Sequence, residues 1–279
     1  MHARMLAAGP ETELAGIWAR RPRAAEELAA VHGTVAARSY EELLDRSEAV
    51  AFAVPPAVQA ELAPAAARAG RAVLLEKPLG PDLASARAVA DAVAAAGVVS
   101  QLVLTKRYHP ATREFLRRAA AADVHGARSC YLHGAFLGGD FATQWRLEHG
   151  ALLDLGPHLL DLLDAAVGPI ASVRGTGDPR RWIELTCEHE NGAVSQASLS
   201  GTVRLPRART RIELFGPGEE LVYDTAELDH DLCWPVLRAE FAHAVRARPA
   251  VALDARRGLR LQELIESVGP LRPSSPGPR

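Results

Sequence analysis

Three polar side chains that could carry out acid–base chemistry recur within one leucine-rich segment. Asp154, His158 and Asp161 are spaced by four and three residues, so a helix would place them on one face. A carboxylate beside an imidazole can bind a hydroxyl group and take its proton. Pro157 lacks an amide hydrogen and suits a first turn, which predicts a helix start at about Leu153. A core histidine paired with a capping aspartate would give the same pattern.

A second chemical signal follows the apolar run at residues 73–75, where the chain continues with Glu76, Lys77 and Pro78. A short apolar run of this kind is typical of a buried parallel strand, and ligands of open α/β sheets bind at the carboxyl ends of such strands. Taken alone, these three residues are more often a solvated strand exit than a site.

Together and in this order, segments 73–78 and 150–161 resemble the two motifs of the Gfo/Idh/MocA oxidoreductase family, which includes glucose-fructose oxidoreductase and inositol dehydrogenase. The resemblance extends from Met1 to about Val268. It implies an NAD(P)-dependent oxidoreductase that transfers a hydride between a nicotinamide cofactor and a sugar, cyclitol or similar polyol or carbonyl compound. It also implies a homo-oligomer that assembles through a C-terminal sheet.

The resemblance also assigns roles to individual residues. Lys77 would lower the pKa of the substrate hydroxyl, while Asp154 and His158 would hold the substrate and relay its proton. Arg107, in a loop that matches the family's Arg-x-x-Pro pattern, would lie near substrate or cofactor, although an exposed basic connection fits the loop as well. Trp145 and Arg146 resemble positions that shape the substrate pocket. The remaining cofactor-binding positions that we expect are Pro55, Pro56 and Glu76.

Residues 12–18 form an apolar run that predicts a strand. Cofactor choice is predicted from the end of this strand. No acidic residue follows it to bind a ribose 2′-hydroxyl, whereas Arg20 and Arg21 could bind a 2′-phosphate. We therefore expect NADP in preference to NAD, with two solvated arginines as the alternative interpretation.

Two departures from the family pattern are visible. Gln59 stands where many relatives have histidine, and no Gly-x-Gly-x-x-Gly turn occurs in the chain. We expect that the sequence starts one element late, so that a first strand and a glycine loop would lie upstream of Met1. The alternatives to an active enzyme are a non-catalytic dinucleotide- or sugar-binding regulator of the same fold and an inactive truncated remnant.

Composition narrows the class of partner. Lys and Arg total 32 against 34 Asp and Glu, so no basic surface argues for nucleic acid or anionic membrane, and a small-molecule partner is expected. The three cysteines lack metal-ligand spacing and predict a reducing compartment with neither a disulfide framework nor a metal site. No signal-peptide core or membrane span is recognisable, which indicates a cytoplasmic protein.

The order of the elements predicts two domains. Strand and helix signals alternate over residues 1–105, typical of a Rossmann-type parallel sheet that lacks its first strand. Residues 106–270 carry runs of strands between helices, which predicts an α+β domain with an open antiparallel sheet, and residues 271–279 predict a disordered tail. The strands of the second domain are expected at residues 127–136, 170–176, 182–187, 193–199, 209–215 and 220–223.

Overall fold

The computed structural model describes residues 1–269 and residue 271, so the predicted tail lies, apart from residue 271, outside the described residues. The chain forms two compact units. Unit 1 comprises Met1–Thr105 and Leu232–Leu259, and unit 2 comprises Lys106–Asp231 and Arg260–Arg279. Residues 232–259, which the sequence analysis placed in the second domain, therefore fold into unit 1. Within the described part of the chain, no helix has the length and apolar character needed to cross a membrane.

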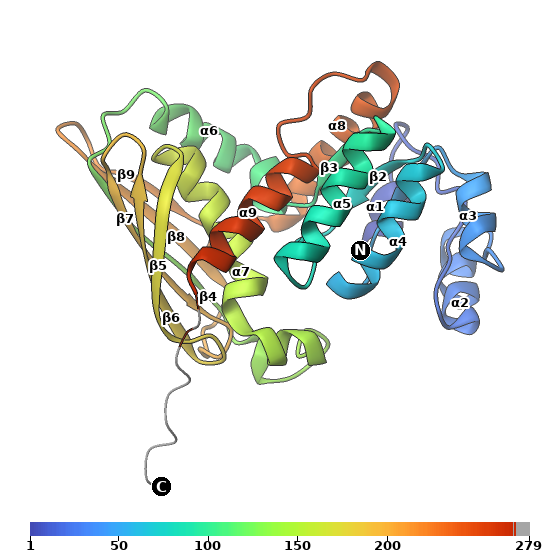
Figure 1. The fold of residues 1–279 in the computed structure, drawn as a ribbon, viewed down its shortest axis with the longest axis horizontal. Helices are drawn as coiled ribbons and strands as arrows, with labels where there is room; N and C mark the ends of the chain where they lie inside the picture. Colours follow the sequence, from blue (N-terminus) through green and yellow to red (C-terminus); the bar gives the residue numbers. More distant parts are fainter. Residues whose placement is uncertain (270, 272–279) are drawn as a thin grey trace, which may run out of the picture. The chain divides into compact units, whose positions relative to one another are not determined.

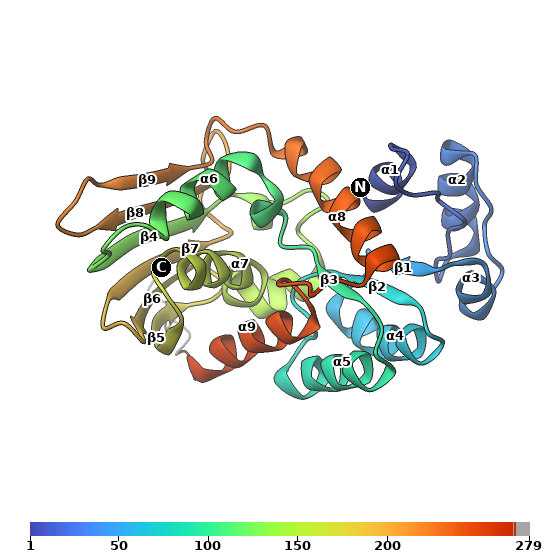
Figure 2. The ribbon, with the colours of Figure 1, turned by 90° about the horizontal axis from the view of Figure 1, so that it is seen from above.

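Unit 1 is organised around a parallel three-stranded sheet in the order β1-β2-β3, with helices packed on it (Figure 1; Figure 2). Its central strand is buried along its whole length, as predicted for a doubly wound sheet. The elements are α1 (His2–Ala7), α2 (Pro22–His32), α3 (Tyr40–Arg46), β1 (Ala49–Ala51), α4 (Pro56–Arg68), β2 (Ala72–Leu75), α5 (Leu83–Ala96), β3 (Ser100–Leu102) and α8 (Cys233–Ala247).

The helix boundaries of unit 1 follow local sequence signals. Asp82 accepts a hydrogen bond from the Ser85 amide at the start of α5, and Ser39 accepts one from the Glu42 amide at the start of α3. Gly97, with φ 62°, ends α5 in the left-handed conformation that glycine adopts without a Cβ clash. These caps confirm the predicted alternation of strands and helices.

The strand predicted for residues 12–18 is wrong. This segment forms one isolated parallel bridge, between Ile17 and Ala36, and no regular strand. Among the described residues β1 is an edge strand of its sheet and pairs only with β2. A regular ladder needs a partner that continues along the strand, and the 12–18 segment has one for a single residue pair.

The assignment of α8 to unit 1 has a local cause. Arg238 is 7% exposed, and its guanidinium donates to the Met5 carbonyl at 3.0 Å and to the Glu11 carboxylate at 2.9 Å. Gln101, at the end of the parallel sheet, donates to the Leu237 carbonyl at 3.1 Å. These long-range bonds attach α8 to residues near the N-terminus and to β3, which short-range sequence patterns do not reveal.

Unit 2 is built on a six-stranded sheet in the order β5-β6-β7-β4-β8-β9 (Figure 1). All neighbouring strands are antiparallel except β4 and β7, which are parallel. The sheet is therefore mixed and not purely antiparallel as predicted, because β4 inserts between the β5-β6-β7 meander and the β8-β9 hairpin. Its strands are β4 (Gly126–Leu132), β5 (Ile170–Asp178), β6 (Trp182–His189), β7 (Val194–Ser200), β8 (Arg209–Phe215) and β9 (Leu221–Asp224).

Helices cover one face of this sheet. The α7 helix packs against β4, β6 and β7, and α6 packs against β9. The remaining helical segments are η1 (Thr105–Tyr108), α6 (Pro110–Ala119), η2 (Ala135–Leu137), α7 (Gln144–Ala166), η3 (His230–Leu232) and α9 (Ala255–Ser267), of which α9 begins in unit 1 and continues in unit 2.

The α7 helix is interrupted at Gly150. This residue has φ 74° and ψ −163°, and a Cβ there would lie 2.3 Å from the Pro179 carbonyl oxygen, so only glycine fits. The Ala151 amide donates to the same oxygen at 2.7 Å and starts the second helical segment. The predicted start at about Leu153 is thus two residues late, and Pro157 lies inside the helix and not in its first turn.

Candidate active site

The first group of candidate residues lies in unit 1, where β2 ends. Glu76 and Lys77 are partly exposed, and the Lys77–Pro78 peptide bond is cis. One oxygen of the Glu76 carboxylate accepts from the Lys77 amide at 3.2 Å, and the other lies 3.2 Å from Nε2 of His2. Glu76 therefore supports the backbone that carries Lys77, consistent with a role in support and not in reaction.

Gln59 ties this loop to α4. Its side chain is fully buried, its Oε1 accepts from the Glu76 amide at 2.7 Å, and its Nε2 donates to the carbonyls of Glu76 at 2.8 Å and Leu79 at 3.2 Å. A longer contact of 3.4 Å reaches the Pro78 carbonyl. One amide thus satisfies the backbone on both sides of Lys77. The sequence identified Gln59 only as a departure from the family pattern.

The other cofactor positions predicted in unit 1 are placed as follows. Arg20 and Arg21 are exposed, and Arg21 is the N-cap residue of α2. Pro55 is exposed after β1, and Pro56 is the buried first residue of α4. Both prolines and Lys77 follow the carboxyl ends of neighbouring parallel strands, which is the edge where open α/β sheets bind ligands.

The second group of candidate residues lies in unit 2, on α7. Asp154, His158 and Asp161 are 5%, 6% and 0% exposed, and leucines occupy the surrounding positions. Buried carboxylates need charged or hydrogen-bonding partners. Asp154 and Asp161 therefore require such partners.

Each carboxylate on α7 has an arginine partner. The Arg107 guanidinium donates to Asp161 at 2.8 Å, and the Arg146 guanidinium donates to Asp154 at 3.1 Å. These pairs offset the cost of burying the carboxylates and fix them on either side of His158. The sequence predicted Arg107 as a site residue and gave Arg146 little weight. The structure brings both into contact with the predicted helix.

Aromatic side chains of β4 and η2 line the same region. The Tyr131 ring centroid lies 6.0 Å from that of His158 and 5.6 Å from that of His133, which in turn packs against Phe136. Sequence reasoning missed Tyr131 and His133. Their i, i+2 spacing is a usable signal, because alternate residues of a strand point to the same face.

The segment before Gly150 presents an aromatic-flanked cation. The Arg146 guanidinium carbon lies 4.6 Å from the Trp145 ring centroid and 5.7 Å from that of Phe141, whose side chain is 63% exposed. Aromatic faces and a guanidinium are suited to hold the apolar faces and hydroxyls of a sugar. The role of Trp145 and Arg146 in shaping a substrate pocket stays a prediction.

Two surface hollows of unit 2 lie elsewhere. The larger, about 640 Å³, is bordered by the ends of α6 and α7 and by the β6–β7 turn, and the smaller, about 480 Å³, adjoins the β8–β9 turn. None of the candidate residues lines either hollow. Among the described residues, no group of three or more His, Cys, Asp or Glu side chains is arranged to hold a metal ion.

Two domains of a known protein family match this chain. Residues 1–103 match the Gfo/Idh/MocA "Oxidoreductase family, NAD-binding Rossmann fold", and residues 110–221 match the "GFO/IDH/MocA C-terminal domain". The two matches contain both groups of candidate residues.

Individual relatives agree with the family match. The dTDP-3,4-didehydro-2,6-dideoxy-alpha-D-glucose 3-reductase of Streptomyces violaceoruber is 30% identical over 61% of this chain and 51% of its own length, so the match spans about half of that relative. GenD2 from gentamicin A biosynthesis, solved in complex with NAD, superposes with a TM-score of 0.85 over 95% of this chain and 88% of its own, at 23% identity. Levoglucosan dehydrogenase, solved with NADH and levoglucosan, gives a TM-score of 0.84 over 95% and 90% of the two chains at 17% identity. The fold of these structures is therefore shared.

Proposed function

This chain belongs to the Gfo/Idh/MocA oxidoreductase family, and from that premise we propose that it transfers a hydride between a nicotinamide cofactor and a sugar or similar polyol. The observation that supports this most directly is that the fold holds both groups of candidate residues in defined positions. Lys77 is held at the end of a parallel strand by Gln59, and Asp154 and His158 are buried together on α7. The names of the relatives, reductases and dehydrogenases, do not favour a non-catalytic regulator.

The residues of unit 1 suit part of a dinucleotide. The exposed Arg20 and Arg21 could hold a 2′-phosphate at the start of α2, and Pro55 and Lys77 follow adjacent strand ends where a nicotinamide ribose would lie. The chain carries no glycine-rich turn for the pyrophosphate. Once bound, the cofactor would accept or donate the hydride, and the remaining chemistry would belong to the protein.

The protein's part is to move a proton and to stabilise charge. The ammonium of Lys77 favours the alkoxide form of the substrate hydroxyl, because a positive charge lowers the pKa of a nearby hydroxyl. His158 takes the hydroxyl proton in the oxidation direction and returns it in the reduction direction. Asp154, held by Arg146, accepts a hydrogen bond from the hydroxyl or from the imidazole and orients it.

A direct test uses purified protein, NADP or NAD, and a panel of sugars, cyclitols and polyols, with nicotinamide absorbance as the readout. Lys77→Ala, Asp154→Ala and His158→Ala should each lower turnover at least ~100-fold, the usual scale for a positioned acid–base group. His243→Ala is the matched control, since that histidine is exposed on α8. Wild-type rates in all three variants, with the fold preserved by circular dichroism, would show that the site is wrongly assigned.

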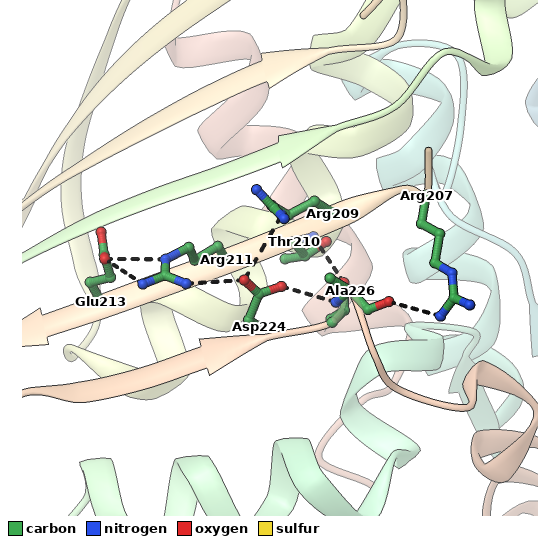
Figure 3. A network of polar contacts seen from close by, with 8 residues as sticks. Arg207, Arg209, Thr210, Arg211, Glu213, Asp224 and Ala226 are labelled. Atoms are coloured by element: carbon green, nitrogen blue, oxygen red, sulfur yellow. Dashed lines mark hydrogen bonds and ion pairs between the residues drawn. The ribbon is translucent and has the colours of Figure 1, made fainter. Parts of the chain in front are cut away.

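We also propose that copies associate through the uncovered face of the unit 2 sheet. That face carries a chain of paired charges in which Arg211 contacts Glu213 at 2.9 Å and Asp224 at 3.1 Å, and Arg209 approaches Asp224 (Figure 3). Partly exposed apolar side chains, Trp182 among them, accompany the charges. Light scattering should give a multiple of the 29.8 kDa chain mass, and Arg211→Glu should reduce it.

A further inference from the structure

Lysine is rare in this chain, and its positions are therefore informative. Of the 32 basic Lys and Arg side chains, only Lys77 and Lys106 are lysines, and arginine supplies every other. Lys77 is already part of the candidate site. Because almost every basic residue of this chain is an arginine, the presence of a lysine at position 106 needs a local reason.

The neighbouring residue provides a contrast. Arg107 uses its planar guanidinium to bind the Asp161 carboxylate at 2.8 Å. The Lys106 ammonium instead lies 4.0 Å from the centroid of the Tyr131 ring. A compact ammonium over an aromatic face is attracted by the ring quadrupole. The two adjacent basic residues of η1 therefore make different contacts, Arg107 with a carboxylate and Lys106 with an aromatic ring.

The ring under Lys106 is the one that meets His158. The Tyr131 and His158 rings are 6.0 Å apart at an interplanar angle of 67°, an edge-to-face contact. The Lys106 ammonium is 4.0 Å from the Tyr131 centroid, and that centroid is 6.0 Å from the His158 centroid. The ammonium therefore lies no further from the His158 ring centroid than the sum of these two distances. All three residues belong to unit 2.

We propose that Lys106 is a positioning residue for His158, holding the Tyr131 ring against the imidazole and using its positive charge to favour the neutral, proton-accepting form. The proposal rests on the function of His158 put forward above. A nearby positive charge opposes protonation of an imidazole, so loss of the ammonium should make His158 take up a proton at higher pH.

Other titratable groups around α7 also influence the protonation of His158. Asp154 and Asp161 on the same helix favour the imidazolium, but each is paired with an arginine, Arg146 and Arg107 respectively. From β4 the facing groups are Tyr131 and His133, and the inward titratable side chains of β6 are Cys187 and His189. His189 is bound to the Gly168 carbonyl near the end of α7, and α6 buries Thr112, Phe115 and Ala119, which do not titrate. Removal of Lys106 takes away a positive charge and leaves the Arg107–Asp161 and Arg146–Asp154 pairs in place.

The test is an NMR titration of the His158 ring in the full chain, with the signal assigned by its loss in His158→Gln. Lys106→Met should move the midpoint to higher pH, and Lys106→Arg should restore it because the charge is kept. Arg117→Met is the matched control, since it removes one positive charge from an exposed position on α6. In all these variants the acid limb of kcat/KM should move with the midpoint.

A double-mutant cycle tests the ring. Tyr131→Leu should release the ammonium to solvent, so that adding Lys106→Met then shifts the His158 midpoint by less than half of its effect in the wild-type background. An unchanged midpoint in Lys106→Met overturns the proposal, as does an equal shift in Arg117→Met or a full shift in the Tyr131→Leu background. The titration needs no substrate, so failure to find turnover would count against the proposed function and leave this test intact.

Discussion

Gln59→Leu should show how much the loop that carries Lys77 depends on one buried amide. Leucine has a similar size but neither accepts nor donates, so the change removes the 2.7 Å bond from the Glu76 amide and the donor bonds to the Glu76 and Leu79 carbonyls. Each buried backbone group left unpaired costs about 1–3 kcal/mol. Water can reach Glu76, whose side chain is 26% exposed. We therefore count two of the backbone groups that lose Gln59 as fully unpaired. We expect the free energy of unfolding to fall by about 2–6 kcal/mol.

The functional effect should exceed what the loss of stability alone would produce. The four contacts of Gln59 reach the residues on both sides of Lys77, so the loop should shift when they are lost. A misplacement of about 1 Å at a reacting centre costs on the order of 100-fold in rate. We therefore expect kcat to fall by roughly 10- to 100-fold, with a smaller change in the KM for substrate.

Three measurements decide this prediction: the urea midpoint, hydrogen exchange of the Glu76 amide, and steady-state kinetics. Tyr40→Phe is the matched control, because it removes a partly buried side-chain bond to the Leu62 carbonyl of α4, the helix that carries Gln59, without touching the loop. The reasoning is refuted if Gln59→Leu and Tyr40→Phe have the same urea midpoint and the Glu76 amide stays equally protected in both.

Three further outcomes are expected. Arg20→Ala combined with Arg21→Ala should weaken NADP binding ~10-fold or more and leave NAD binding nearly unchanged in titration calorimetry, since only NADP carries the 2′-phosphate; parallel losses for both nucleotides would contradict this. Arg107→Met should destabilise the protein by about 3–5 kcal/mol in urea, because it removes a charged partner of the 0% exposed Asp161 carboxylate, and adding Asp161→Asn should recover most of the loss. Burial raises the pKa of the Cys187 thiol from 9.0 to about 11, so the folded state binds the extra proton between these values and stability should fall by about 2–3 kcal/mol as pH rises through them. Urea midpoints of Cys187→Ala should lack this decline, and an identical pH dependence in the two proteins would exclude the thiol as its source.

The sequence by itself determined the features that depend on neighbours along the chain. The Asp82 cap and Gly97 stop of α5, and the face shared by Asp154, His158 and Asp161, follow from backbone hydrogen bonding and from the helical repeat. The family resemblance rested on two such local segments and is confirmed by the matches to both domains.

Only the tertiary structure decided which distant groups meet. Arg107 reaches Asp161 across 54 residues, Gln59 reaches the loop before Pro78, and Tyr131 on β4 packs against His158. The insertion of β4 beside β7 and the folding of residues 232–259 into unit 1 also depend on contacts between residues far apart in the sequence. The physical reason is that a buried polar group must find a partner, but any suitably placed donor or acceptor will satisfy it. Local sequence therefore predicts that a buried polar group has a partner, and the packing of the whole chain determines which residue that partner is.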